Sequence, residues 1–374
     1  MKTSTQRRNT QKTDKPQDLH KDNSHQTYQQ TIQDTFHQPQ RGKNKNPFTI
    51  TATCGNARTG ILHTAHGNII TPFFMPVATR ASGKYIGTDA YASINAQAII
   101  VNALITFFSP GLEVISTAGG IHPFMNFKKC IAADSGGFQM SRGMFEKTTA
   151  NGAWFCNPFT KQRFHITPQK SMVIQRLIGA DIAMVLDVMP PVESSRNAAE
   201  TAVAQTHQWA KECLHHHTAL QGKKIIDGLV QHNPNQLLFA ISQGALFADL
   251  RKHSAAYLSS LEYEGKGFDG IAIGGLAIGE PQEKMLPMIE AAVAGMPQQK
   301  IRYLMGVGNP LDILEAVERG IDCFDSVFPT QNARHGTLFT WQGKVDLLSG
   351  KMKQKHEPLD EGCDCFVCKH YSVA

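Results

Sequence analysis

Three cysteines near the end of the sequence have the residue type and spacing of a metal site. Cys363, Cys365 and Cys368 form a C-x-C-x2-C pattern that spans six residues. Thiolates are soft ligands, and a structural Zn²⁺ site is tetrahedral and closes with a fourth Cys or His. Cysteines that only fill a core seldom gather so closely. The pattern therefore predicts a structural zinc site, although His370 follows Cys368 too closely to be an obvious fourth ligand.

Carboxylates and side-chain amides follow several apolar runs. Asp134, Asp187 and Asp325 each come near the end of such a run, and Asn102 and Gln243 stand near the ends of two others. A single aspartate in this position is about as often a turn former as a functional group. A buried carboxylate is costly unless it is paired or used, so turn formation is a poor explanation for all of them together. The set predicts a site with one nucleophile, one general acid/base and acceptors for an amidine-like edge.

The apolar runs indicate how these side chains are brought together. From residue 47 onward, eight runs alternate with helical patterns, which is typical of a parallel sheet with crossover helices. Eight such units favour an α/β fold of the (β/α)8 TIM-barrel type over a doubly wound sheet, and functional groups of such barrels gather at the carboxyl ends of the strands. The predicted strands are residues 68–77, 98–104, 130–137, 181–187, 237–244, 268–275, 301–308 and 320–329.

Helix signals and one long gap refine this organisation. Thr167 and Pro168 have the N-cap and N1 chemistry of a helix start, and Gly320 is placed to end a later helix. The gap at residues 138–180 is longer than one helix requires. It predicts an insertion in the barrel, with a β-hairpin within residues 150–166.

Composition divides the chain into three parts. Residues 1–46 hold nine Lys or Arg and four Asp, so they carry +5 of the formal charge of +6. They contain few large apolar groups to offset the entropy of ordering, and we expect a disordered basic tail. The tail either has no role or adds weak attraction to a polyanion. Residues 47–335 are expected to form the catalytic barrel, and residues 336–374 a β-hairpin followed by an incomplete zinc-binding subdomain.

The overall composition excludes some classes of protein. The chain has 374 residues, of which 41% are hydrophobic, and this is enough for a substantial core. No apolar stretch approaches the roughly 20 residues of a membrane span. The eight cysteines have no regular spacing and no secretory signal precedes them. We therefore expect no membrane association, no disulfide framework and a cytoplasmic location.

Six motifs in order resemble the signature of the tRNA-guanine transglycosylases, the queuine tRNA-ribosyltransferase family, in a bacterial-like form. The resemblance runs from about residue 50 to the end. In that family a zinc-bearing (β/α)8 barrel exchanges the wobble guanine of certain tRNAs for a 7-deazaguanine during queuosine biosynthesis. The motifs are DSGGFQ (134–139), FAISQG (239–244), GGLAIGE (274–280), RYLMGVG (302–308), FDSVFPTQNARHG (324–336) and PLDEGCDCFVC (358–368).

The resemblance implies roles for the strand-end residues. Asp325 is expected to be the nucleophile that attacks the ribose anomeric carbon and forms a covalent tRNA–enzyme intermediate. Asp134 is expected to hold the base and act as general acid/base, and Asn102 to orient Asp325 through a hydrogen bond. This is the logic of retaining glycosyl transfer, in which one carboxylate attacks and another moves protons.

Other residues are implied to bind the purine. Asp187, Gln243 and the backbone of Gly275 read its edge, Phe138 and Met305 cover its faces, and Ser135 adds a polar contact. The backbone of Leu276 faces the substituent of the 7-deazaguanine, and Glu280 polarises that peptide. The segment resembles its bacterial form and favours 7-aminomethyl-7-deazaguanine over queuine. Arg334 is expected to contact tRNA.

The sequence also departs from the family pattern. Asn102 is retained after the second predicted strand, but the residues around it differ, and Asp187 is followed by Val188-Met189 where bacterial members have Glu-Cys. Gln331 and His335 stand where Arg and Asn are common. The family's fourth zinc ligand is a His further downstream than this sequence extends, so we expect either that the polypeptide is truncated and binds zinc poorly, or that His370, solvent or another chain completes the shell. Members pair through this region, which makes a homodimer possible.

Two other functions are compatible with the pattern to different degrees. A catalytically impaired RNA-binding paralogue or partner subunit is the main alternative, although the retained carboxylates favour activity. An unrelated barrel enzyme such as an aldolase requires a Schiff-base lysine or a metal cluster at the strand ends, and the sequence offers neither.

Overall fold

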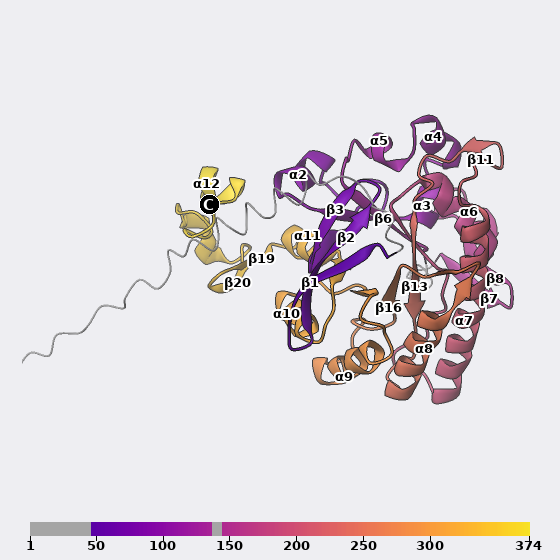
Figure 1. Ribbon diagram of the computed structural model, residues 1–374. Coiled ribbons are helices and arrows are strands. Elements are labelled where there is room, and N and C mark those ends of the chain that lie inside the picture. Colours follow the sequence, from indigo (N-terminus) through magenta and orange to yellow (C-terminus); the bar gives the residue numbers. More distant parts are fainter. Residues whose placement is uncertain (1–45, 137–143) are drawn as a thin grey trace, which may run out of the picture. The chain divides into compact units, whose positions relative to one another are not determined.

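The computed structural model describes residues 46–136 and 144–374 (Figure 1). The expected basic tail therefore lies almost entirely outside the described residues, and so does Phe138. Among the described helices, none is both long enough and apolar enough to cross a membrane.

Eight parallel strands form the barrel that the sequence predicts. Their hydrogen-bonded order is β4-β18-β17-β16-β13-β10-β6-β5. The two outer strands meet at the Val77–Ile100 bridge, where the N–H of Ala78 donates to the carbonyl of Ile100 over 2.7 Å and helps to close the ring. The strands are β4 (Phe73–Pro76), β5 (Ala98–Asn102), β6 (Cys130–Asp134), β10 (Ile182–Met184), β13 (Leu237–Ser242), β16 (Gly270–Ile273), β17 (Ile301–Leu304) and β18 (Cys323–Ser326).

The first predicted strand, residues 68–77, is wrong as a single element. It divides at Pro72 into β3 (Gly67–Thr71) and the barrel strand β4. Proline has no N–H to donate to a strand ladder, which favours a break at this position. β3 instead pairs with β2 (Ala57–Thr64), which pairs with β1 (Phe48–Cys54), in a separate antiparallel sheet.

Crossover helices surround the strands. The predicted N-cap at Thr167 is confirmed, because its side chain accepts the N–H of Lys170 and α6 (Pro168–Ile178) begins with Pro168. Gly320 lies just past the end of α10 at φ 91°, as expected of a helix stop. The other helices outside the strand-end loops are α7 (Arg196–Ala219), α8 (Ala248–Ser260), α9 (Gln282–Val293) and α10 (Pro310–Glu318).

Shorter elements fill the loops. Asn102 ends β5 and caps α3, because its Oδ1 accepts the N–H of Ile105. The short elements are α2 (Thr88–Ser93), α3 (Ala103–Phe108), α4 (Leu112–Thr117), α5 (Ile121–Met125), α11 (Phe328–Arg334) and the two-residue pairs β11–β12 (Ile225–Ile226, Leu229–Val230) and β14–β15 (Glu262–Tyr263, Lys266–Gly267).

The insertion after β6 contains more than the predicted hairpin. β7 (Phe145–Thr149), β8 (Gly152–Cys156) and β9 (Arg163–Ile166) form a three-stranded antiparallel sheet. Its first turn contacts α7, because the carbonyl of Ala150 accepts the indole N–H of the fully buried Trp209 over 3.1 Å. This bond joins the insertion to the barrel.

The C-terminal residues contain the predicted hairpin, β19 (Thr337–Thr340) and β20 (Gly343–Asp346), followed by a 3₁₀ turn (Gly350–Gln354) and α12 (Phe366–His370). The buried Asp360 carboxylate accepts the N–H of Trp341 in the hairpin and the N–H of Gly362 beside the cysteines. The loop that carries the cysteines is therefore held against the hairpin.

Candidate active site

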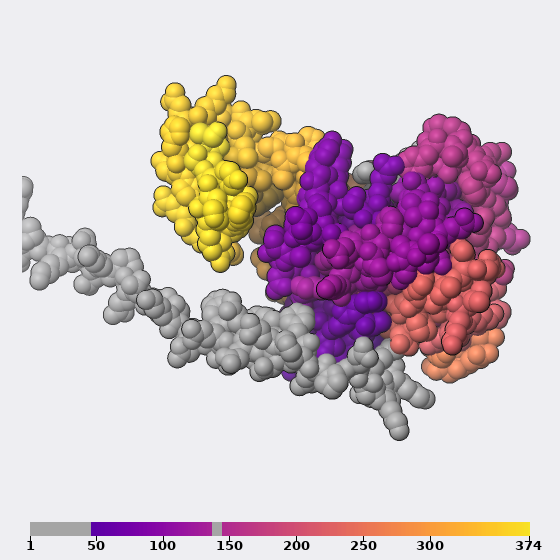
Figure 2. Space-filling view, turned by 90° about the horizontal axis from the view of Figure 1, so that it is seen from above, coloured from indigo at the N-terminus to yellow at the C-terminus, as the bar shows by residue number. Residues whose placement is uncertain are grey.

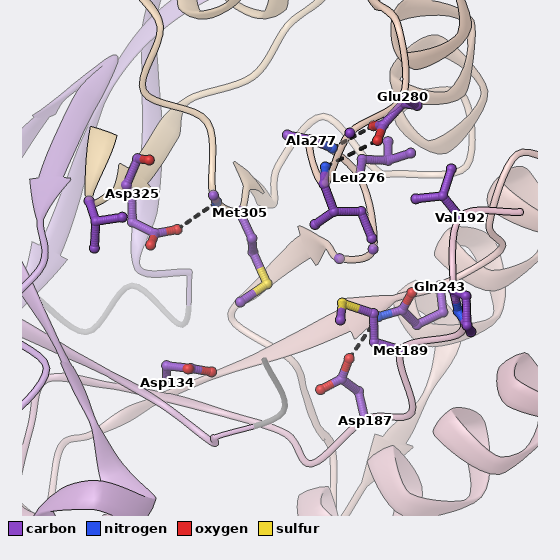
Figure 3. Close-up of a pocket in the computed structure, with 18 of the residues that line it drawn as sticks. Asp134, Asp187, Met189, Val192, Gln243, Leu276, Ala277, Glu280, Met305 and Asp325 are labelled. Atoms are coloured by element: carbon purple, nitrogen blue, oxygen red, sulfur yellow. Dashed lines mark hydrogen bonds between the residues drawn. The ribbon is translucent and has the colours of Figure 1, made fainter. Parts of the chain in front are cut away.

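A cavity of about 980 Å³ opens at the carboxyl ends of the barrel strands. Parallel register places the ends of neighbouring strands side by side, and Asn102 on β5 lies opposite Asp134 on β6. Figure 3 shows carboxylates from three different strands converging on the cavity. Nine of the predicted site residues line it, namely Asn102, Asp134, Asp187, Gln243, Gly275, Leu276, Glu280, Met305 and Asp325.

Asp325 is held in place by two donors from the neighbouring strand β17 and its loop. Its Oδ1 accepts the hydroxyl of Tyr303 over 2.5 Å and the N–H of Gly306 over 2.9 Å. Burial raises the pKa of Asp325, and these two hydrogen bonds lower it in part. Both bonds go to Oδ1, so neither of them occupies Oδ2.

Asp134 is suited to carry a proton near neutral pH. Its pKa is raised to about 7, first by burial and then by the negative charges of Asp187 and Asp325. A general acid/base works best when its pKa lies near the working pH. Asp134 therefore has a pKa suited to proton transfer in both directions near neutral pH, and Asp325 lies on the same rim of the cavity.

The expected hydrogen bond from Asn102 to Asp325 is corrected by the structure. The Asn102 amide donates to Oδ2 of Asp134 over 3.1 Å, and its Oδ1 caps α3. Because β5 and β6 are adjacent and paired in register, Asn102 is beside Asp134 and positions that carboxylate. The side chain that orients Asp325 through a hydrogen bond is Tyr303.

Asp187 and Gln243 form a polar pair on adjacent strand ends. The Gln243 amide donates to Oδ2 of Asp187 over 2.7 Å, while Gln243 Oε1 is buried without a hydrogen-bond partner in the described residues. Burial raises the pKa of Asp187 to about 6, against the lowering effect of this bond. The pair therefore retains free acceptor positions for a ligand that donates from N–H groups.

The segment after β16 is fixed by one buried arginine. Arg251 of α8 is fully buried and donates to the carbonyls of Ala245, Gly274 and Gly275. Gly275 has φ 65°, and a Cβ there would lie 2.6 Å from Gln243 Oε1. Only glycine fits this place without displacing Gln243.

Glu280 controls the orientation of the next peptide. Its Oε1 accepts the N–H of Ala277 over 2.5 Å and its Oε2 accepts the N–H of Ile278. The N–H and C=O of a trans peptide point in opposite directions, so the Leu276 carbonyl points away from Glu280. Figure 3 shows both bonds at the edge of the cavity.

The remaining predicted residues lie in different surroundings. Ser135 is buried, and it is not among the described residues that line the cavity. Phe138 lies outside the described residues. Arg334 is exposed at the end of α11, the helix that directly follows β18. Met305 reaches into the cavity from one side, and Met189, which the prediction noted only as a departure, lies beside Gln243 (Figure 3).

The three C-terminal cysteines form a compact donor set. One sulfur from each of Cys363, Cys365 and Cys368 lies within 4.8 Å of the others. The N–H of Cys368 points to the Cys365 sulfur over 3.5 Å, and hydrogen bonding from Cys368 lowers the pKa of Cys365. Three converging thiols, one of them stabilised as a thiolate, fit a soft metal ion.

The sequence reasoning did not assign two supporting residues. Tyr303 lies two positions before Met305 inside one of the motifs, and Arg251 lies on a helix outside all of them. The spacing of Tyr303 and Met305 on the strand could have indicated that both face the barrel interior. No sequence signal identifies Arg251, because its partners are backbone carbonyls.

Comparison with known proteins places this site in a family. The family model described as "Queuine tRNA-ribosyltransferase" matches residues 53–374. A protein of that name from Fusobacterium nucleatum subsp. nucleatum is 43% identical over 321 residues, which is 86% of this chain and 82% of that protein. A namesake from Halothermothrix orenii is 42% identical over 319 residues, 85% and 80% of the two chains. One from Thermotoga maritima is 40% identical over 325 residues, 87% and 83% of the two chains.

Proposed function

Because this chain belongs to the queuine tRNA-ribosyltransferase family, a family of pentosyltransferases, we propose that it is a tRNA-guanine transglycosylase of queuosine biosynthesis. It exchanges the wobble guanine of a tRNA anticodon for a 7-deazaguanine. The observation that carries the proposal for the site is the convergence of Asp134, Asp187 and Asp325 on one cavity at the carboxyl ends of the barrel strands.

The proposed chemistry divides between two carboxylates. Asp325 attacks the ribose anomeric carbon, so a bond from its carboxylate oxygen to that carbon forms while the bond from the carbon to guanine breaks. Asp134 donates a proton to the departing guanine. In the second half-reaction the ionised Asp134 takes a proton from the incoming base, and that base displaces Asp325. The pKa of about 7 at Asp134 supports both directions.

The purine edge is proposed to lie against Asp187, Gln243 and the backbone of Gly275. A guanine-type edge presents N–H donors, and these three groups offer acceptors or a backbone contact on one wall of the cavity. Met305 and Phe138 are proposed to cover the faces of the extruded base, with Ser135 as an additional polar contact. Stacking of this kind contributes about 1–3 kcal/mol per base.

The inserted base is proposed to be 7-aminomethyl-7-deazaguanine. Glu280 fixes the peptide whose carbonyl belongs to Leu276, and a carbonyl can accept a hydrogen bond from the ammonium group of that base. Leu276 and Glu280 both line the cavity, which supports a role in recognising the substituent.

The remaining partners follow from the family and from exposed groups. Arg334 is proposed to contact the tRNA backbone, and Zn²⁺ to be the metal of the three cysteines, where it holds the loop. The C-terminal residues, yellow in Figure 2, expose large apolar side chains that support a homodimer contact: Trp341, Leu348 and Phe366.

A cytoplasmic location is proposed because tRNA is the substrate. The barrel limits, residues 47–335, and the subdomain limits, residues 336–374, are also proposals.

Incorporation of labelled guanine into unmodified tRNA tests the activity, because guanine exchange requires no choice of 7-deazaguanine. The wild type should incorporate label and form a denaturation-resistant adduct with tRNA. Asp325→Ala should abolish both, whereas Asp89→Ala, a change at an exposed aspartate of α2, should behave as wild type. An adduct that survives in Asp325→Ala would remove the nucleophile assignment. Binding of tRNA by the wild type without incorporation would favour a catalytically impaired RNA-binding subunit.

A further inference from the structure

A second cluster of metal-ligand side chains lies at the other end of the barrel strands. Asp181 precedes β10, whereas the active-site residue Asp187 follows it. Nδ1 of His66 lies 2.8 Å from Oδ1 of Asp181, and Nε2 of His122 lies 3.2 Å from Oδ2. One ligand atom of each residue lies within 4.8 Å of the other two. The proposed exchange reaction uses none of these groups.

The carboxylate of this cluster is fixed by the barrel. Asp181 is 1% exposed, its Oδ2 accepts the N–H of Ile131 over 3.0 Å, and its own N–H donates to the carbonyl of Ile131. The two histidines come from segments outside the sheet. His66 is in the turn between β2 and β3, and His122 is in α5. The cluster therefore joins two surface segments to the base of the barrel.

His122 has one nitrogen that hydrogen bonding does not account for. The side chain is 8% exposed, and its Nδ1 lies 3.1 Å from the carbonyl oxygen of Phe127, which requires a proton on Nδ1. Nε2 is buried and faces Oδ2 of Asp181 at 3.2 Å, a contact that lacks the geometry of a hydrogen bond. A metal-ligating histidine usually donates its other ring N–H to a backbone carbonyl, a carboxylate or water, and the contact of Nδ1 with the Phe127 carbonyl has that form.

The packing of the two rings favours neutral imidazole. The rings of His66 and His122 are stacked, with centroids 3.4 Å apart and an angle of 17° between planes. Two imidazolium ions would repel each other at this separation, whereas two neutral imidazoles, the form that binds metals, would not. The His66 ring is about one-third exposed on its turn, and it can tilt so that its lone pair converges with that of His122.

The distances and the adjoining space suit a small ion. Ligands bound at about 2.0–2.2 Å to a tetrahedral ion lie about 3.3–3.6 Å from each other, so the atoms that are 2.8 and 3.2 Å apart would have to separate by less than about 1 Å to admit an ion. A cavity of about 480 Å³ borders His66 and His122 and has room for solvent as a further ligand.

We propose that His66, His122 and Asp181 bind a divalent transition-metal ion of the Zn²⁺ or Co²⁺ type, with solvent at the remaining position. Residues at the amino ends of barrel strands contribute to stability rather than to catalysis. The ion therefore clamps the β2–β3 turn and α5 to the barrel. The competing explanation is a triad held by hydrogen bonds alone.

Cobalt titration of the metal-free full chain distinguishes this site from the cysteines. Cysteine-bound Co²⁺ gives intense thiolate charge-transfer absorption, whereas a histidine–carboxylate site gives only weak ligand-field bands. Besides the Co²⁺ at the cysteines, the wild type should bind one Co²⁺ whose binding adds no charge-transfer absorption. His66→Ala should weaken that binding by at least about tenfold. His63→Ala, on the neighbouring strand β2 and bonded to Asn68, should leave it unchanged.

Thermal unfolding gives a second readout. Zn²⁺ at about 100 times its dissociation constant should raise the melting temperature of the wild type and of His63→Ala more than that of His66→Ala or Asp181→Asn. If Asp181→Asn does not fold, the comparison of His66→Ala with His63→Ala still decides. Equal cobalt binding by these two variants, or cobalt bound only through thiolates, would overturn the proposal.

Discussion

The three carboxylates of the cavity differ in environment although they share a residue type. Asp325 receives a hydroxyl and a backbone N–H, Asp134 receives one amide, and Asp187 is paired with Gln243. Asp134 is also close enough to the other two for their charges to raise its pKa. Carboxylates of one site in different environments differ in proton affinity, which is the condition for the separate acid/base and nucleophile roles that we propose.

The pH dependence of adduct formation should report Asp134. Its acid form, needed to protonate the departing guanine, is lost as pH rises through about 7. The single-turnover rate of adduct formation should therefore fall above pH 7 in the wild type. Asp134→Asn should lower the rate by about 10²–10⁴-fold and remove this limb of the profile. A wild-type rate that rises through pH 7 would contradict the acid role.

Stability provides an independent check of the same pKa. The pKa of Asp134 is about 7 in the folded protein and 3.8 for an ordinary aspartate. Between these values the unfolded chain loses a proton that the folded chain keeps, so the free energy of unfolding falls as pH rises from about 4 to 7. Urea unfolding across this range should show a smaller decrease for Asp134→Asn.

At the scale of elements, helices outside the barrel hold the loops that form the cavity. Thr206 of α7 accepts the N–H of Val188 and so fixes the loop after β10. Arg251 of α8 does the same for the loop after β16 through the carbonyls of Gly274 and Gly275, and it also donates to the carbonyl of Ala245 in the loop after β13. These bonds connect strand-end loops to helices of the outer layer, so the site depends on the packing of both helices.

Replacing Arg251 should damage both stability and base binding. Arg251→Met removes the donor to the carbonyls of Ala245, Gly274 and Gly275 and should lower the free energy of unfolding by about 3 kcal/mol or more. It should also raise KM for the free base, because Gly275 and Leu276 lose their support. Urea unfolding and base-exchange kinetics measure the two effects.

The matched control is Arg196→Met on α7. Arg196 is half exposed and paired with Glu200 and Asp249 at the surface. Such pairs contribute little to stability, so this variant should unfold and bind base like the wild type. Equal effects of the two substitutions would show that Arg251 has no special role in the loop.

At the scale of the whole molecule, the chain joins a catalytic barrel to a small unit with its own metal donors. The last residues return to the unit, because the N–H of Val373 donates to the carbonyl of Glu357 and that of Ala374 to the carbonyl of Lys355. Few apolar side chains of this unit are buried, Cys368 being one of them. A unit with so small a core requires an additional cross-link for stability, and a structural metal ion can supply one.

Removing one cysteine should remove that metal. Cys365→Ser should lose one Zn²⁺ per chain and the thiolate charge-transfer band of the Co²⁺ form, because two thiols hold the ion much more weakly than three. Cys54→Ser, a change at an exposed free cysteine of β1, should keep both. Metal analysis after gel filtration checks this, and unchanged metal content in Cys365→Ser would require a different donor set.

The sequence alone determined the barrel, the insertion, the terminal hairpin and most of the cavity. The spacing of apolar residues and the lengths of the apolar runs specify the strands and helices. The carboxyl ends of parallel strands must lie at the same rim of the barrel. Asp134, Asp187 and Asp325 were predicted from their places at the ends of apolar runs, and the family motifs contain Asp134 and Asp325. These features follow from local patterns and from chain order.

Only the tertiary structure decided which groups touch. Asn102 bonds to Asp134 and Tyr303 to Asp325 because strand adjacency, not sequence distance, selects partners. The pKa of Asp134 depends on charges from two other strands, and the cluster at Asp181 joins residues 115 positions apart. Hydrogen bonds and charges act over a few ångströms in space, and a sequence pattern does not state those distances.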